Sequence, residues 1–157
     1  GCGNAKLGEI LNITLEDAKG VRNKFEKSLP ALKTLVDQVR RKYKTVGYIK
    51  GLDGRRLIPK AEYSALNTLI QSAGALIVKQ GTIILNEELY KSGFKWGEDY
   101  AMVLHVHDEM QFYVKKERLE EFKTIALSIF NKTKDFFNFR CPLDGEIKVG
   151  QNWSDTH

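Results

Sequence analysis

Apolar and polar positions alternate on both sides of an acidic pair, Asp108-Glu109, in the second half of the chain. The alternating apolar residues are Met102, Leu104, Val106, Met110, Phe112 and Val114. A period of two in a segment rich in β-forming residues predicts two strands joined by a tight turn. The acidic pair is therefore expected at the tip of a β-hairpin.

Helical patterns fill most of the remaining chain. They predict a helix over residues 4–11 with Asn4 as its N-cap, a second from Thr14 through about Lys27, and a third that restarts at Pro30. A long, mostly apolar helix is expected from about 62 to 91, and another from about 117 to 137. Gly74 and Gly81, inside the long helix, suggest close approach of another backbone.

Two further strand signals complete the picture. Residues 46–50 and 55–58 flank the turn Gly51-Leu52-Asp53-Gly54, which is typical of a second hairpin. Residues 146–149 are expected to form a final short strand. Hairpins and long helices without βαβ alternation predict an α+β fold, with a small antiparallel sheet backed by long helices and an N-terminal helical segment.

Length, net charge, cysteine content and hydrophobic runs limit the classes of protein to which the chain can belong. At 157 residues the chain can bury one sizeable core, and its net charge of +5 is moderately basic. Cys2 and Cys141 lack metal-binding spacing, so disulfides and zinc–thiolate sites are not expected. No apolar run approaches membrane-spanning length and no signal-peptide pattern opens the chain, which favours a cytoplasmic protein without a membrane partner.

The acidic pair is the candidate metal site. A hairpin tip holds Asp108 rigidly beside solvent, where a catalytic divalent cation could bind. Adjacent residues on extended backbone point to opposite faces, so Asp108 and Glu109 alone are poorly arranged for two metal ions. A partner aspartate is then expected from outside the chain. The alternatives are a plain polar turn, and for His105 and His107 either an His-x-His metal pair or, preferably, ordinary packing.

A polar row marks the start of the long helix. Tyr63, Asn67 and Gln71 recur every four residues and share one helical face. Asn and Gln can read acceptors in the DNA minor groove, and Arg55 and Arg56 are suitable phosphate ligands. From spacing alone, a solvated strip is the preferred interpretation of the polar row, and Arg55 and Arg56 are equally compatible with ordinary surface charge.

Four blocks of the sequence together resemble the C-terminal part of family A (Pol I-like) DNA polymerases, closest to the bacteriophage replicative type. The blocks are residues 51–56 (GLDGRR), 64–75 (SALNTLIQSAGA), 106–111 (VHDEMQ) and the ending from 142 to 157. They occur in the family's order, and the resemblance covers essentially the whole chain. The resemblance implies that residues 1–45 are the helical remainder of the fingers subdomain and that 46–157 are the C-terminal part of the palm.

The resemblance also implies a role for each candidate residue. Asp108 would be the second metal-binding aspartate, supported by Glu109, and His107 would lie near the primer terminus. The residues implied to contact primer–template DNA are Asn67, Gln71, Arg56, Arg55 and Tyr63. The reaction would join a primer 3′-hydroxyl to the α-phosphate of a deoxynucleoside triphosphate, assisted by Mg²⁺ at a two-metal site.

The family's other active-site segments have no counterpart in this sequence. The Asp-Tyr-Ser segment with the first metal aspartate and the fingers helix with the nucleotide-binding Lys and Tyr are both missing. We therefore expect the chain to need the N-terminal part of the polymerase and to be inactive alone. It is either an expressed fragment or one piece of a polymerase encoded in two parts, and Cys2 is the type of residue that follows a protein-splicing junction.

Two other functional classes are compatible with parts of the pattern. A non-catalytic duplex DNA-binding module could use the basic charge and the Asn67–Gln71 face without turnover. A metal-dependent phosphohydrolase could use a His-Asp pair, but it would place His107 and Asp108 on a helix and needs further ligands along the chain.

Overall fold

The computed structural model describes residues 2–156, and the chain divides into two compact units, residues 1–73 and 74–157. The division falls inside the long helix α4 (Ala65–Lys91), which contributes to both units. The assignment of residues 1–45 to fingers and 46–157 to palm is a statement about subdomain roles and stays a prediction. Each unit is described by itself below.

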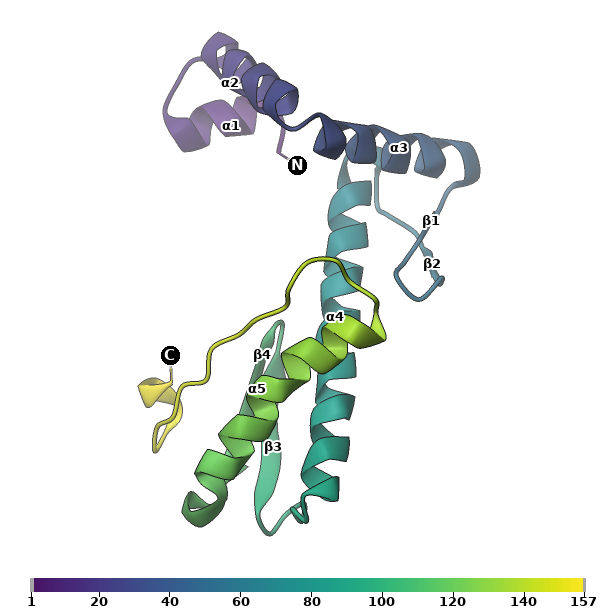
Figure 1. Cartoon of the computed structure of the whole chain (residues 1–157). Coiled ribbons are helices and arrows are strands. Elements are labelled where there is room, and N and C mark those ends of the chain that lie inside the picture. Colours follow the sequence, from purple (N-terminus) through teal and green to yellow (C-terminus); the bar gives the residue numbers. More distant parts are fainter. Residues whose placement is uncertain (1, 157) are drawn as a thin grey trace. The chain divides into compact units, whose positions relative to one another are not determined.

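Three helices open the first unit: α1 (Asn4–Leu11), α2 (Leu15–Ser28) and α3 (Pro30–Val46) (Figure 1). The Thr14 hydroxyl accepts a hydrogen bond from the Asp17 backbone N–H at 3.1 Å, which is the cap expected for α2. Asn4 is not the N-cap of α1, because Gly3 takes that position. The Asn4 side chain instead accepts a hydrogen bond from the Arg22 guanidinium on α2.

A short hairpin follows α3. Strands β1 (Ile49–Lys50) and β2 (Arg56–Leu57) pair antiparallel, with Ile49 opposite Leu57 and Lys50 opposite Arg56. A 3-10 turn (Glu62–Ser64) then leads into α4. Val39 of α3, Ile49 and Ala65 form the buried core of this unit, and the Tyr43 hydroxyl donates to the Pro59 carbonyl at 3.1 Å. The predicted hairpin is therefore present, with shorter strands than expected.

The second unit contains the predicted acidic hairpin. Strands β3 (Tyr100–Val106) and β4 (Glu109–Val114) form a two-stranded antiparallel sheet, and α5 (Leu119–Phe136) crosses it beside the C-terminal part of α4 (Figure 1). The fully or nearly buried core residues are Leu85, Leu89, Phe94, Tyr100, Phe122 and Ile129. This is the α+β arrangement expected from the sequence.

The close approach of another backbone predicted at Gly74 and Gly81 is found at neither position. Gly81 is buried against α5, since a Cβ there would lie 3.5 Å from the Thr133 hydroxyl and 3.8 Å from a methyl of Ile129. A Cβ at Gly74 would meet nothing within 4 Å. Gly81 therefore packs against side chains of α5 at ordinary van der Waals distance, which leaves room for a Cβ.

A β-bulge interrupts the alternation expected along β3. The register shifts between Met102 and Leu104, so that Met102 lies opposite Phe112 but His105 lies opposite Met110. The extra residue, Val103, turns Leu104 and Val106 to the face away from the helices. Met110, Phe112 and Val114 of β4 all pack against the core, as predicted.

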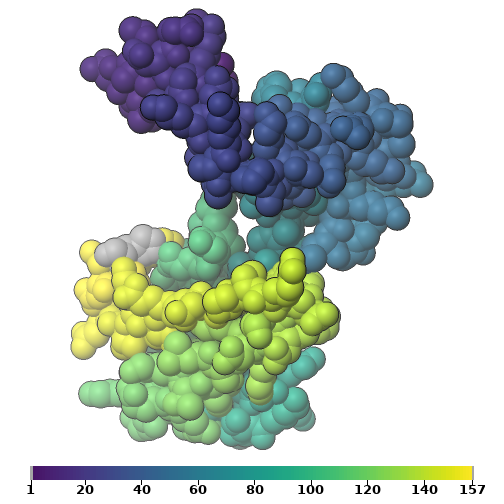
Figure 2. Space-filling view, turned by 45° about the horizontal axis from the view of Figure 1, so that its top comes forward, coloured from purple at the N-terminus to yellow at the C-terminus, as the bar shows by residue number. Residues whose placement is uncertain are grey.

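The strand predicted over residues 146–149 is not formed. After α5 the chain continues without regular structure to a 3-10 turn at Trp153–Asp155, and this segment (yellow) runs over the surface of α5 (green) (Figure 2). Gly145 lies so close to Phe130 of α5 that a Cβ there would fall 2.2 Å from the ring. A strand needs a hydrogen-bonded neighbour, and residues 146–149 pair with neither β3 nor β4, whose outer edges stay open.

The long helix needs one correction. Within the described residues, Glu62–Lys91 is long and apolar enough to cross a membrane, contrary to the expectation that no run approaches that length. Core helices of soluble proteins pass the same test of length and composition. This helix supplies Ala65 to one core and Leu85 and Leu89 to the other. Only 17% of its most apolar stretch is buried, so packing among the described residues accounts for a part of its apolar composition. The absence of a membrane partner stays a prediction.

Asp99 stabilises the end of the β3–β4 hairpin that lies opposite the Asp108 turn. Its carboxylate accepts hydrogen bonds from the Lys115 ammonium at 2.9 Å and from the Lys95 backbone N–H at 3.0 Å, and its side chain is 13% exposed. The Lys115 hydrogen bond, followed by the Lys95 backbone bond, holds the pKa of Asp99 below its ordinary value. Asp99 therefore ties the residue after β4 to the loop before β3.

Replacing Asp99 with asparagine is expected to lower the unfolding temperature at pH 7. The folded-state pKa of Asp99 is depressed, so its carboxylate stabilises the fold above the unfolded-state pKa of about 3.9 and loses that effect as pH falls through the lower folded pKa. Thermal unfolding of both proteins from pH 7 to pH 2.5 measures this. The difference should disappear at the acid end, and a difference independent of pH would contradict the assignment.

Candidate functional site

Asp108 occupies the tip of the β3–β4 hairpin. Val106 and Glu109 form the last paired positions, so His107 and Asp108 are the two residues of the turn. His107 has a φ of 52°, in the left-handed region that tight hairpin turns require. Asp108 is exposed, and its carboxylate has no hydrogen bond or ion pair with any residue between 2 and 156. The tip thus presents a free carboxylate on a short turn.

Glu109, the first residue of β4, directly follows Asp108 in the chain. It is half-buried, and one carboxylate oxygen accepts a hydrogen bond from the Gln111 side-chain amide. Gln111 lies two positions along the strand and therefore on the same face. Sequence reasoning gave Gln111 no role, although a Glu-x-Gln spacing on a strand could have indicated it.

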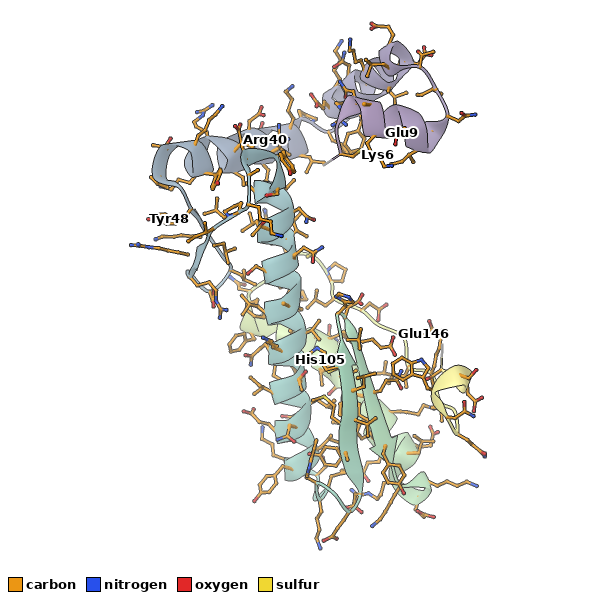
Figure 3. All side chains as sticks on the ribbon, turned by 180° about the vertical axis from the view of Figure 1, so that it is seen from behind. Lys6, Glu9, Arg40, Tyr48, His105 and Glu146 are labelled. Carbon is orange, nitrogen blue, oxygen red and sulfur yellow. The ribbon has the colours of Figure 1, made fainter. Side chains whose placement is uncertain are left out.

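The two histidines are not arranged as a metal pair with a third ligand. His105 faces α4, where it lines a shallow depression with Lys79, Thr82 and Glu87 (Figure 3). His107 is exposed in the turn. Among residues 2–156 no group of three or more His, Cys, Asp or Glu side chains could hold a metal ion. Asp108 and Glu109 would therefore need at least one further ligand from elsewhere.

The candidate DNA-binding residues lie in the other unit. Asn67 and Gln71 are exposed one turn apart on α4, as predicted. Tyr63 is exposed too, but it sits in the 3-10 turn before α4. Arg56 is exposed on β2, with its guanidinium 4.8 Å from the centre of the Tyr48 ring.

Arg55 holds the turn of the short hairpin. Its guanidinium pairs with Asp53, whose carboxylate also accepts the Arg55 backbone N–H at 3.2 Å. Partial desolvation of Asp53 opposes ionisation, but the hydrogen bonds from Arg55 bring its pKa below the ordinary value. Arg55 is thus engaged within the turn, whereas Arg56 is not.

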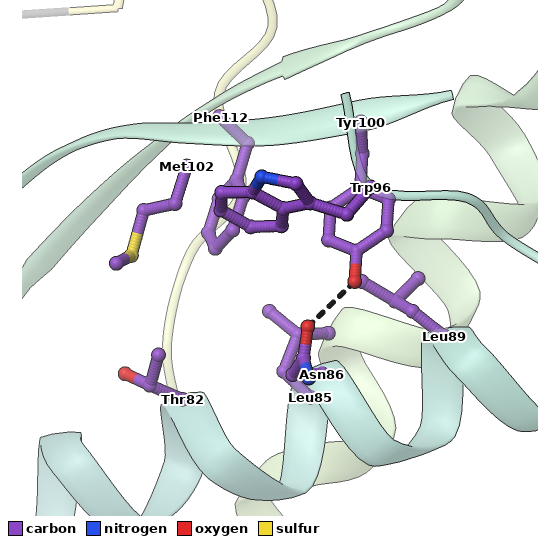
Figure 4. Close-up of a pocket in the computed structure, with 8 residues that line it drawn as sticks. All are labelled: Thr82, Leu85, Asn86, Leu89, Trp96, Tyr100, Met102 and Phe112. Carbon is purple, nitrogen blue, oxygen red and sulfur yellow. Dashed lines mark hydrogen bonds between the residues drawn. The ribbon is translucent and has the colours of Figure 1, made fainter. Parts of the chain in front are cut away.

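A small apolar hollow lies between α4 and the core face of the hairpin. Its volume is about 220 Å³, and Trp96, Met102 and Phe112 line it from the sheet side (Figure 4). The Tyr100 hydroxyl donates to the Asn86 side-chain oxygen at 2.6 Å at its edge, and burial raises the pKa of Tyr100. None of the candidate metal ligands lines this hollow.

The geometry of the hairpin turn argues against one alternative function, that of a metal-dependent phosphohydrolase. A phosphohydrolase of the type considered from the sequence would carry its His-Asp pair on a helix, whereas His107 and Asp108 form a hairpin turn. It would also need a supporting cluster of ligands, which the residues from 2 to 156 do not contain. This alternative is therefore set aside.

Comparisons with known proteins agree on one family. The model of DNA polymerase family A matches residues 1–155. The chain is 35% identical to the DNA-directed DNA polymerases of Enterobacteria phage T3 and Escherichia phage T7, covering all of this chain and 25% of each relative. It is 32% identical to DNA polymerase I of Aquifex aeolicus, covering 96% of the chain and 26% of that protein.

A solved structure shares the fold. The polymerase domain of Pol1 from M. smegmatis, in complex with DNA primer-template and dNTP, superposes with a TM-score of 0.86 at 22% identity, covering 99% of this chain and 28% of that one. The chain thus spans about a quarter of the length of the curated relatives it matches. On the match of its sequence from end to end, this chain belongs to DNA polymerase family A.

Proposed function

We propose that the chain is the C-terminal portion of a template-directed DNA polymerase and contributes one part of its active centre. The observation that carries this proposal is the free, exposed carboxylate of Asp108 on a two-residue turn in a family A chain. A carboxylate held this way is suited to bind a divalent cation beside a nucleic-acid strand. Glu109 and His107 flank it and complete the contribution of this chain.

Mg²⁺ fits the donors that the hairpin offers. It prefers carboxylate oxygens and typically uses one or two of them together with water and substrate phosphates. Asp108 would bind directly, and Glu109, oriented by Gln111, would support the site. Bound metal ions would activate the primer 3′-hydroxyl and stabilise charge on the leaving pyrophosphate. The remaining aspartate comes from a polypeptide outside this chain.

The exposed face of the hairpin supports a polypeptide partner. Val106 and Tyr113 lie on the face away from the helices and are 42% and 63% exposed. Both outer edges of this two-stranded sheet lack a neighbouring strand among residues 2–156, so their backbone N–H and C=O groups can pair with a further strand. The N-terminal part of the polymerase would cover this face and supply the missing ligand.

The polar row on α4 serves recognition of the primer–template. Asn67 and Gln71 would contact purine N3 and pyrimidine O2 acceptors, which occur in every base pair, so their contacts sense duplex shape more than sequence. Arg56 would bind the backbone, with Arg55 holding the turn beneath it. Tyr63 is exposed near the same helix end and would lie at the edge of this contact.

A non-catalytic DNA-binding module is the second candidate. It is favoured by the charge of residues 1–73, which carry fourteen Lys and Arg against seven Asp and Glu. Such a module would bind duplex DNA without any metal requirement. Turnover therefore separates the two functions.

Primer extension tests the proposal. The chain is assayed alone and together with the complementary polypeptide, identified from the DNA upstream of its reading frame, with a primed template, dNTPs and Mg²⁺. We expect extension only when both polypeptides and the metal are present. Extension by the chain alone would contradict the proposal. DNA binding without extension in the assembled pair would favour the non-catalytic module.

A further inference from the structure

Positive charge is concentrated in one part of the first unit. Residues 40–60 carry eight Lys and Arg but a single acid, Asp53, which is paired with Arg55. By contrast, residues 74–157 carry eleven Lys and Arg and thirteen Asp and Glu. The excess thus belongs to the C-terminal half of α3 and to the β1–β2 hairpin, which pack together through Val39, Ile49 and Leu57.

The hairpin places two cations directly opposite each other. Lys50 on β1 pairs in register with Arg56 on β2, and both side chains are exposed. Ile49 and Leu57, the neighbouring pair, point into the core, so Lys50 and Arg56 share the outer face. Like charges directly opposite in an antiparallel pair are destabilising. Neither has an acidic partner within hydrogen-bonding or ion-pair distance among residues 2–156.

Tyr48 completes this face and orients Arg56. It lies two residues before Lys50, and the Arg56 guanidinium rests 4.8 Å from its ring centre. Its side chain extends from the hairpin away from the start of α4 (Figure 3). A cation stacked on an aromatic ring is held in place while its N–H groups stay available. The outer face of the hairpin is thus a preorganised pair of cations without a counter-ion.

We infer that the Tyr48–Lys50–Arg56 face of the β1–β2 hairpin binds a phosphodiester group of a DNA strand. An anion between Lys50 and Arg56 would remove their mutual repulsion, and guanidinium geometry matches phosphate oxygens. The inference rests on the proposed function, because it takes DNA as the anion. It adds Lys50 and Tyr48 to the DNA contacts and assigns backbone binding, without base reading, to this face.

A charge reversal at Lys50 tests the inference, and the unfolding temperature of the variant shows whether it still folds. Lys50→Glu would replace a repulsive cross-strand pair with an attractive one, so its unfolding temperature should equal or exceed that of the wild type. The matched control is Lys24→Glu, an exposed cation on α2 with the same change of charge. Binding of labelled single-stranded and duplex oligonucleotides by the full 157-residue chain is measured by fluorescence anisotropy at several salt concentrations.

We expect Lys50→Glu to weaken binding about tenfold relative to Lys24→Glu, and to reduce the slope of log K against log salt by about 0.7 on single strands or about 0.9 on duplex. The oligonucleotide with the larger loss identifies which form the hairpin holds. Equal losses in the two variants would overturn the inference. That result would leave the proposed function standing, because primer extension by the assembled polymerase tests it separately.

Discussion

Replacing Asp108 with asparagine should reduce primer extension by the assembled polymerase about a thousandfold. Metal ions at such a site contribute several kcal/mol of transition-state stabilisation, and each 1.36 kcal/mol corresponds to a factor of ten in rate. Asparagine keeps the size of the side chain but lacks the negative charge that holds the cation. Asp108 is exposed in a turn, so the fold should tolerate the change.

The rate must fall without a matching loss of DNA affinity. Single-turnover extension gives the rate, and anisotropy with the same primer–template gives the affinity. Glu117→Gln is the matched control, because Glu117 is an exposed carboxylate after β4 in the same unit. Its rate should stay within twofold of the wild type. Equal losses of rate in both variants, or a loss of Asp108→Asn activity explained by weaker DNA binding, would contradict the metal role.

Truncating Leu89 to alanine should destabilise the second unit by about 2–5 kcal/mol. Leu89 is fully buried, and its cluster includes Phe94, Tyr100 and Phe122. Removing its side chain loses hydrophobic transfer energy and leaves a cavity beneath the hairpin. Urea unfolding followed by circular dichroism measures the change. Because α4 and β3 meet at this cluster, the position of the carboxylate tip depends on it.

Leu127→Ala provides the comparison. Leu127 lies on α5 in the same unit but is 48% exposed, so its truncation should cost less than about 1 kcal/mol. Similar destabilisation in the two variants would mean that Leu89 is not a core residue. It would also remove the physical reason for a fixed hairpin tip.

Local patterns predicted most elements of the fold. Thr14 and Pro30 mark helix starts because capping and the fixed φ of proline act within one turn of the chain. Likewise the alternation of Met110, Phe112 and Val114 reports the buried face of a strand. These signals depend only on residues that are neighbours in the sequence, so they can be recognised before the tertiary structure is known.

The predictions that were wrong failed because the residues that decide the local structure lie far away in the sequence. Asn4 does not cap its helix, since Gly3 takes the N-cap position and the Asn4 side chain accepts a hydrogen bond from Arg22 of α2. The bulge near Val103 turns His105 toward α4, which strict alternation cannot foresee. Residues 146–149 form no strand, since a strand needs a pairing neighbour. Similarly, the like-charge pair of Lys50 and Arg56 exists only once the register of the short hairpin is known.

The candidate site was predictable in part. The pattern alone placed Asp108 at a hairpin tip, and the structure agrees. No pattern within the chain could supply a second metal aspartate, and the assignment of roles to Asp108, Glu109, Asn67 and Gln71 rests on the family. The chain matches that family over residues 1–155 while spanning only about a quarter of its relatives.

Metal coordination in the assembled polymerase tests the central proposal most directly. The complex with its complementary polypeptide, a primer–template and an incoming nucleotide is crystallised with Mn²⁺, and the metal positions are located from anomalous scattering. We predict a Mn²⁺ ion bound jointly by the Asp108 carboxylate and by a carboxylate of the other polypeptide. Metal ions coordinated entirely outside this chain, with Asp108 turned away from them, would contradict the account.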